Sequence, residues 1–349
     1  MAVRIALDAM GGDRGPHEVV AGAVQAVGEI DDVAVTLVGD QQIITAALRD
    51  LKQSGNPRLR IAHTSQVVAM DESPFEAVRK KRDSSIIVAF EHLKNGEADA
   101  VVSAGNSGAT MAAAIRSLGR LRHISRPGIA SVFPTLKGPV VMMDVGANVD
   151  CRPQHLFQFG VMASAFSQVL FDIPRPRIGL LSIGEETGKG NLLVKKAHDL
   201  FRQSPLNFIG NVEGRDTFQG DVDVIVCDGF VGNVCLKLSE GLAEAVLAML
   251  REEIAKSIKA QVGYLFAKDA FAHFKRRVDY AEYGGAPLLG LNGTGIICHG
   301  RSNAVAIKNA VKVGAELVRR KANDRILALL SEAGTIDDPD VEEKAGAAP

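Results

Sequence analysis

The 349-residue chain contains no tryptophan, only 3 tyrosines and only 4 cysteines. No two cysteines form a CxxC pair, so the spacing typical of a zinc site is absent and no metal is expected. Cys227 and Cys298 lie within apolar runs, which predicts buried free thiols of the kind found in a reducing cytosol. The first residues begin a strand and lack the basic and long apolar segments of a signal peptide, so we expect a cytoplasmic protein.

An excess of charge of one sign and long hydrophobic runs are also missing. Lys and Arg number 40 against 41 for Asp and Glu, and this balance leaves no overall field that would attract nucleic acid. The longest uncharged stretch, 153–171, carries Gln, His and Ser side chains, which favours a buried helix over a membrane span. Glycine is abundant, and its 35 residues predict many tight turns and places where the backbone approaches a ligand closely.

Short apolar, β-branched runs alternate with longer amphipathic ones along the chain. This alternation predicts an α/β fold built of βαβ units around a mostly parallel sheet. We expect one large α/β domain over residues 1–335 and a flexible tail over 336–349. The expected strands are 3–7, 34–38, 58–62, 100–104, 129–133, 140–144, 177–181, 207–211, 223–227 and 296–300. The expected helices are 16–28, 41–53, 74–95, 106–118, 153–171, 191–203, 231–260 and 302–320.

The stretch 239–280 differs from the rest of the chain. Apolar residues from Leu242 to Val262 recur at helical spacing opposite charged ones, which predicts a long amphipathic helix. Aromatic residues and then three basic ones follow, which favours a helical hairpin that projects from the sheet. Two roles remain open for this hairpin: dimerisation, and an apolar tip that dips into the membrane interface beside basic residues.

Glycine-rich polar loops follow several of the expected strands. In an open parallel sheet, ligands gather beyond the carboxyl ends of the strands. Glycine lets backbone N–H groups face a ligand, and a helix that starts just afterwards adds its positive dipole end, so such loops bind anions such as phosphate. The candidate substrate-binding and phosphate-binding residues are Asp8, Gly11, Gly12, Gly105, Asn106, Ser107, Asp144, Asn148, Gly188 and Asp228.

Two side chains in these loops are candidates for catalysis. Lys189 is followed by Gly190 rather than Ser or Thr, so its loop is not a nucleotide P-loop, and no strand leads into a clean GxGxxG. Lys189 either places a point charge on phosphate or on a developing oxyanion, or is a solvated loop lysine. Asn233 either holds a carbonyl oxygen with its amide or is a plain helix N-cap.

For several other polar residues, both a structural and a functional interpretation remain open. The three aspartates that follow strands, Asp8, Asp144 and Asp228, either orient a lysine or cap helices. His299 is expected to cap or pack, with catalysis as the weaker alternative. A basic run is either a solvated helix face or a docking surface for an acidic partner, and its residues are Arg79, Lys80, Lys81 and Arg82.

Eight blocks in order along the chain resemble the bacterial phosphate acyltransferase family called PlsX. The resemblance runs from residue 4 to about 330, almost the whole chain. The family's SAGNTGA occurs here with Ser107, which keeps a hydroxyl group, and its GLLNIG occurs with Ser182, so no amide role is assigned there. The blocks are IALDAMGGD (5–13), SAGNSGA (103–109), DVGANVD (144–150), GLLSIGEE (179–186) with KGN (189–191), NFIGNVEGRD (207–216), CDGFVGNVCLK (227–237), EYGGAPLLG (282–290) and HGRS (299–302).

The resemblance implies a homodimer with a three-layer α/β/α fold related to phosphotransacetylases and isocitrate-dehydrogenase-like proteins. It implies transfer of a fatty acyl group from acyl-acyl carrier protein to inorganic phosphate, giving acyl phosphate for phospholipid synthesis. A membrane acyltransferase would then use that product to acylate glycerol 3-phosphate. The resemblance further implies peripheral membrane association, no metal or redox cofactor, and Lys189 and Asn233 as the catalytic residues.

Alternatives remain at the level of mechanism and of function. Phosphate is itself a nucleophile, so the enzyme needs none, whereas a competing mechanism forms an acyl-enzyme on Cys151 or Cys235. Among functions, acyl-CoA instead of acyl carrier protein could be the donor, and a non-catalytic, membrane-recruited scaffold that binds carrier protein is a second alternative. An NAD-dependent dehydrogenase is a third, which the lack of GxGxxG disfavours.

Overall fold

A computed structural model describes residues 2–278 and 283–334 of the chain. The expected tail over 336–349 lies outside these described residues. Eleven strands form one sheet in the order β3-β2-β1-β4-β11-β10-β5-β6-β9-β7-β8. The strands are β1 (Val3–Asp8), β2 (Val33–Gly39), β3 (Leu59–His63), β4 (Ala100–Ser103), β5 (Gly128–Pro134), β6 (Pro139–Met143), β7 (Ile178–Leu181), β8 (Phe208–Val212), β9 (Val224–Val226), β10 (Ala286–Leu289) and β11 (Thr294–Ile297).

Helices follow most of the strands, as expected for βαβ units. The described helices are α1 (Pro16–Glu29), α2 (Gln41–Asp50), α3 (Pro74–Lys80), α4 (Ser85–Lys94), α5 (Ser107–Leu118), α6 (Pro153–Phe171), α7 (Leu192–Arg202), the 3₁₀ helix η1 (Gly214–Phe218), α8 (Gly229–Ala255), α9 (Ile258–Val278), α10 (Ala304–Arg319) and α11 (Ala322–Ala333).

The sheet is mostly parallel, as predicted, but its strands run in two opposite directions. Strands β3, β2, β1, β4 and β11 are mutually parallel, and so are β6, β9, β7 and β8. Between these two sets lie β10 and β5, each antiparallel to both of its neighbours. The short strand β10 was not among the expected strands, and it is one of the two elements through which the direction reverses.

Helices cover both faces of the sheet because the strands carry apolar side chains on both faces. In β1, Ile5 and Leu7 belong to the core that includes α1 and α10, whereas Ala6 belongs to the core that includes α4 and α5. In the other half, Met142 and Ile225 join a third cluster, against which the first turns of α8 pack. The expected three-layer α/β/α fold is confirmed.

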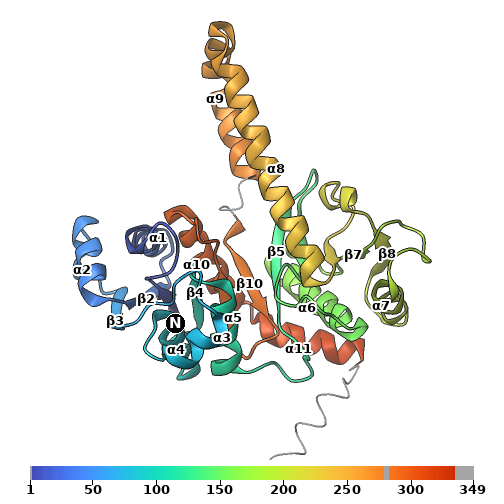
Figure 1. Ribbon diagram of the computed structural model, residues 1–349, viewed down its shortest axis with the longest axis horizontal. Helices are drawn as coiled ribbons and strands as arrows, with labels where there is room; N and C mark the ends of the chain where they lie inside the picture. Colours follow the sequence, from blue (N-terminus) through green and yellow to red (C-terminus); the bar gives the residue numbers. More distant parts are fainter. Residues whose placement is uncertain (1, 279–282, 335–349) are drawn as a thin grey trace, which may run out of the picture.

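The helical hairpin that the sequence predicted is formed by α8 and α9, which project from the body of the protein (Figure 1). Its break comes earlier than expected, because α8 ends at Ala255 and α9 begins at Ile258. Among the helices that the structure describes, none combines the length and apolarity that crossing a membrane requires.

The prediction of a single helix over 74–95 is wrong, because the structure has two helices there, α3 and α4. The intervening residue Asp83 accepts hydrogen bonds from the backbone N–H and the hydroxyl of Ser65, at 2.8 and 2.5 Å. These bonds tie the segment to the loop after β3, so tertiary contacts override the helical periodicity.

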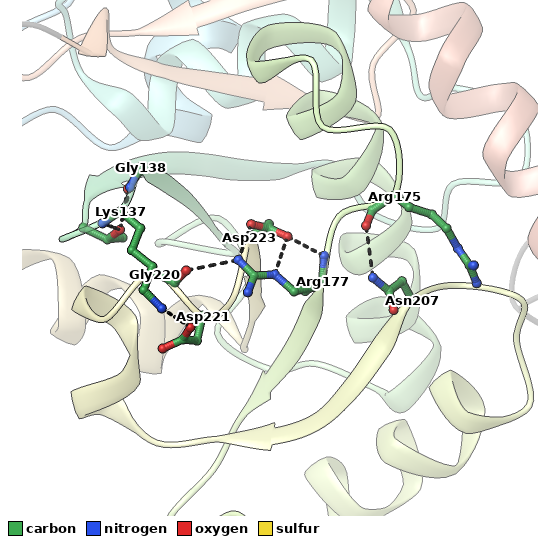
Figure 2. Close-up of polar contacts among 9 residues, drawn as sticks. Lys137, Gly138, Arg175, Arg177, Asn207, Gly220, Asp221 and Asp223 are labelled. Atoms are coloured by element: carbon green, nitrogen blue, oxygen red, sulfur yellow. Dashed lines mark hydrogen bonds and ion pairs between the residues drawn. The ribbon is translucent and has the colours of Figure 1, made fainter.

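An ion pair joins the amino-terminal ends of β7 and β9 (Figure 2). Arg177 donates from its backbone N–H and Nε to Asp223 Oδ2, at 2.7 and 3.0 Å, and from Nη2 to Asp223 Oδ1 at 2.9 Å. Arg177 Nη2 also donates to the carbonyl of Gly220 at 3.1 Å. Burial raises the pKa of Asp223, but the hydrogen bonds from Arg177 outweigh it and leave this pKa below its usual value. The pair therefore holds the amino-terminal ends of β7 and β9 together, at the opposite end of β9 from the start of α8.

Candidate active site

The carboxyl ends of the two oppositely directed strand sets meet at one level of the sheet. Ile297, the last residue of β11, pairs with Ala286 of β10, and Leu288 of β10 pairs with Ile129 of β5. Two residues further along β5, Ser131 pairs with Met142 near the end of β6. Loops from both halves therefore face the same crevice, at a reversal of strand direction of the kind where α/β sheets bind ligands.

The loops after β1 and β4 pack closely against each other on one side of this crevice. A Cβ atom on Gly11 would lie 2.5 Å from the backbone nitrogen of Gly105, so glycine is required for this approach. Beneath it, the buried carboxylate of Asp8 accepts a hydrogen bond from Ser103 Oγ at 2.7 Å. Burial raises the pKa of Asp8. The geometry thus shows Asp8 supporting the two loops from below.

Asn106 caps α5 and connects it to the segment before α3. Its Oδ1 accepts from the backbone N–H of Ala109 at 3.0 Å, and its Nδ2 donates to the carbonyls of Met70 and Glu72, each at 3.0 Å. The amide of Asn106 is therefore engaged within the protein. Ser107, the first residue of the helix, is exposed toward the crevice.

The loop after β6 is organised around the carboxylate of Asp144. The backbone N–H groups of Gly146, Ala147 and Asn148 donate to this carboxylate at 3.2, 3.1 and 2.7 Å, and Asn148 Nδ2 donates to it at 2.9 Å. The backbone N–H of Ile129 on β5 adds a bond of 3.1 Å. Burial raises the pKa of Asp144. The amides that glycine was expected to offer to a ligand are here satisfied by the protein itself.

We expect Asp144→Ala to lower the free energy of unfolding by about 2–4 kcal/mol, because it leaves several buried N–H groups without their acceptor. The loss will also displace the loop that borders the crevice, so turnover should fall with stability. Urea unfolding of this variant beside Asp150→Ala, an exposed aspartate of the same loop, measures the effect. Equal stability of the two variants would contradict the organising role of Asp144.

The start of α8 packs directly on the Asp144 loop. Asp228 is the N-cap, accepting from the backbone N–H of Val231 at 2.9 Å. A Cβ on Gly232 would lie 1.9 Å from the carbonyl oxygen of Asp144, so only glycine allows this contact. Asn233, one residue later, is exposed and lies against Gly146. The N-cap interpretation of Asn233 is therefore wrong, while the same interpretation of Asp228 is confirmed.

A cavity of about 1210 Å³ occupies the crevice and extends along α8. At the end of the cavity nearest the loops, Asn233 and Ser107 line it, as do three cationic side chains that the sequence reasoning did not single out: Arg14, Lys237 and Arg301. Lys237 pairs with Glu240 at 2.9 Å, whereas Arg14 and Arg301 are exposed in loops after β1 and β11. Arg14 and Arg301 could have been found from their position in the sequence, since each follows a strand within a glycine-containing loop.

The other predicted residues lie around this cavity rather than on its surface. Asp8, Gly11, Gly105, Asn106, Asp144 and Asn148 are buried in the loops that surround the crevice. Lys189 and Gly188 are exposed on the loop after β7, outside the cavity lining, although β7 pairs with β9, the strand that leads into α8. Substrate contact by any of these residues, and by Gly12, stays a prediction.

The cysteine thiols near the crevice are held in their unreactive, protonated form. Burial raises the pKa of Cys151 and of Cys298 to about 12, and it also raises the pKa of Cys235. His299 lines the cavity, and its Nδ1 accepts from the backbone N–H of Arg301 at 3.0 Å. Burial, aided by nearby Lys237, lowers the pKa of His299, so its ring is neutral at physiological pH. The thiols therefore carry little thiolate, the form that attacks carbonyl groups.

The same three-layer α/β/α fold occurs in solved structures of phosphotransacetylases. The structure is similar to a phosphotransacetylase from Streptococcus pyogenes, with a TM-score of 0.61, 18% identity, and coverage of 91% of this chain and 94% of that one. It is also similar to the EutD phosphotransacetylase from Staphylococcus aureus, with a TM-score of 0.60, 17% identity, and coverage of 91% and 94%. At these identities the likeness establishes the fold alone.

The chain belongs to the family described as fatty acid synthesis protein, whose model matches residues 3–325. It is 53% identical to a phosphate acyltransferase of Nitratidesulfovibrio vulgaris (strain DP4) over 324 residues, 93% of each chain. It is also 53% identical to a phosphate acyltransferase of Citrifermentans bemidjiense over 331 residues, 95% of this chain and 94% of the relative. The resemblance to the bacterial phosphate acyltransferase family is confirmed, and the protein is an acyltransferase.

Proposed function

We propose that this protein transfers a fatty acyl group from acyl-acyl carrier protein to inorganic phosphate, forming acyl phosphate for phospholipid synthesis. The observation that supports the proposal most directly is the cavity in which Arg14, Arg301 and Ser107 from one half of the sheet face Asn233 from the other. Two reactants held on opposite walls in this way gain the advantage of fixed proximity and orientation. The relatives named phosphate acyltransferase support phosphate as the acceptor.

Phosphate is assigned to the wall formed by the loops after β1, β4 and β11. Ser107 is the first residue of α5, where backbone N–H groups lack intrahelical partners and the helix dipole is positive. The guanidinium groups of Arg14 and Arg301 add charge and can each bind phosphate with two parallel hydrogen bonds. This combination of helix start and arginine recognises an oxyanion without a metal ion.

The acyl thioester is assigned to the opposite wall, where α8 begins. A phosphate oxygen attacks the thioester carbonyl, the carbon–sulfur bond breaks, and the carrier thiol leaves with a proton. Asn233 Nδ2, near the positive end of α8, would donate to the oxyanion that forms on the carbonyl oxygen. The raised pKa values of the cysteines favour this direct attack over an acyl-enzyme intermediate.

The carrier protein is assigned to the surface formed by α3, beside the mouth of the cavity. A Cβ on Gly108 of α5 would lie 2.6 Å from Pro74 Cγ, so α3 begins directly against the helix whose first residue lines the cavity. Lys80 pairs with Glu76 and Lys81 contacts Glu72, whereas Arg79 and Arg82 are exposed. Phe75, which is 75% exposed, lies one turn from Arg79. This basic and apolar surface suits an acidic carrier protein.

The projecting hairpin carries two exposed apolar surfaces that support the remaining assignments. On α8, Val234, Leu238 and Met249 follow one face and are 50, 70 and 64% exposed, which supports a homodimer formed through this stripe. At the start of α9, Leu265 and Phe266 are 70 and 89% exposed, which supports peripheral membrane contact at the tip. Sedimentation tests the dimer through the stripe on α8, and vesicle flotation tests membrane contact through the tip. Membrane contact at the tip would place the protein where it can deliver acyl phosphate to a membrane glycerol-3-phosphate acyltransferase.

The central experiment incubates the protein with hexadecanoyl-acyl carrier protein, with and without inorganic phosphate, and detects acyl phosphate by mass. We expect acyl phosphate and free carrier protein only when phosphate is present. Substituting hexadecanoyl-CoA as the donor provides the comparison, and turnover equal to that with the carrier protein would favour the acyl-CoA alternative. Phosphate-independent retention of the thioester would instead indicate a scaffold that only binds carrier protein.

A further inference from the structure

The cavity continues away from the catalytic loops as a groove between β5 and α8. On β5, Ile129 and Ser131 line it next to the Asp144 loop, and Phe133 and Leu136 line it further along. The strand rises by about 3.3 Å per residue, so the stretch from Ile129 to Leu136 covers on the order of 20 Å. This wall therefore runs from the reaction centre to the far end of the groove.

The wall on α8 has the same direction and a similar length. Asn233, Lys237 and Glu240 line its first turns, followed by Ala243 and Leu247 at helical spacing. At 1.5 Å per residue, the helix advances about 21 Å between Asn233 and Leu247. Beyond Glu240 the lining side chains of α8 are mainly apolar, apart from the exposed Glu244 and, at the far end, Arg251. Phe218 of η1 and Phe274 of α9 add aromatic surface.

Side chains from three segments frame the far end of the groove. Arg277 of α9 donates from Nη2 to the carbonyls of Thr135 and Leu136, at 2.7 and 2.9 Å. Lys137 contacts Asp221 on the other side of the same turn (Figure 2). Arg251 of α8 also lines the cavity. The turn between β5 and β6 is thus held in place, and the groove has a defined length.

We propose that this groove binds the hydrocarbon chain of the acyl donor and that Leu247 helps to set the chain length that the enzyme prefers. The inference rests on the proposed function, because it places the thioester at Asn233. A ligand with one polar end and a long apolar tail matches a groove that is polar at the catalytic loops and mainly apolar beyond them, over the length of a long-chain acyl group. A second copy of the chain is the competing occupant that the test must separate, although Val234, Leu238 and Met249 give it apolar surface that lies outside the groove lining.

The test compares kcat/KM for hexadecanoyl-acyl carrier protein with kcat/KM for hexanoyl-acyl carrier protein. Leu247→Trp fills the groove beyond the reach of the short chain, so we expect the long-to-short ratio to fall by about tenfold or more. The matched control is Ala248→Trp, which places the same side chain on the next residue, outside the cavity lining. As an exposed substitution, it should leave the ratio within about twofold of wild type.

The outcomes separate this inference from the proposed function on which it rests. Turnover of the hexanoyl donor by Leu247→Trp shows that the variant is folded. An unchanged ratio, or an equal fall for both donors, would overturn the groove assignment. A change in sedimentation with an unchanged ratio would assign the groove to a subunit interface instead. Failure of the wild-type protein to form acyl phosphate from either donor would refute the proposed function itself.

Discussion

Asn233→Ala is expected to lower kcat by about 10²–10³-fold, the typical effect of removing one donor to a developing oxyanion. Asn233 lines the cavity near the positive end of α8, where Gly146 leaves room beside its side chain. Because Asp228 is the helix N-cap and Asn233 is exposed, the substitution removes no capping bond and should leave the melting temperature almost unchanged. Steady-state kinetics with acyl-acyl carrier protein and phosphate, together with thermal unfolding, measure both effects.

The isosteric variant Asn233→Asp tests whether the amide donor is responsible. It keeps the shape of the side chain but replaces the donating N–H groups with acceptor oxygens, so we expect a loss at least as large as in the alanine variant. If the aspartate variant retained substantial activity, the side chain would be acting through its shape and not through donation to the oxyanion. An alanine variant with kcat within a few-fold of wild type would exclude Asn233 from the chemistry altogether.

Lys189→Ala is expected to lower kcat by about 10²-fold, if its ammonium group stabilises charge that develops during transfer. In the structure Lys189 is exposed, and a Cβ on Gly184 would lie 2.9 Å from Lys189 Cγ, so the side chain folds back over its own loop. This glycine-rich loop follows β7, beside the strand that leads to α8. Movement of the loop toward Asn233 would bring the cation to the reaction centre.

Kinetics separate this role of Lys189 from a general effect of surface charge. Lys195→Ala, which removes an exposed lysine from the neighbouring α7, should leave kcat and both KM values close to those of wild type. For Lys189→Ala, a fall in kcat with little change in the KM for phosphate would indicate stabilisation of the transition state. Near-normal activity would show that Arg14, Lys237 and Arg301 supply the positive charge without it.

Local patterns were sufficient for much of the fold. The expected helix over 153–171 coincides with α6, because apolar side chains surround that segment and Pro153 stands in the first turn, where proline is tolerated. Where tertiary hydrogen bonds intervened, local periodicity failed, as at Asp83 between α3 and α4. The strand β10 is only 4 residues long and follows two glycines at positive φ, so it carried too little periodicity to be recognised.

The site was only partly predictable, for an electrostatic reason. A glycine-rich loop indicates that the backbone turns tightly, but not which partner its N–H groups find. In the loop after β6 that partner is the carboxylate of Asp144, which occupies the N–H groups of Gly146, Ala147 and Asn148. The proposed anion site therefore rests on side-chain cations and the start of α5. Asn233 lines the cavity, and its catalytic role stays a prediction.

The sequence by itself determined the α/β class, the glycine loops, the projecting hairpin and the family, because these depend on residues that are close along the chain. The tertiary structure alone decided that two sets of strands run in opposite directions and that their carboxyl ends face one crevice. It also brought Arg14, Asn233 and Arg301 to the same cavity from two loops and a helix that follow three different strands. Residues so far apart are brought together by strand order and register, and these follow from the packing of the whole sheet.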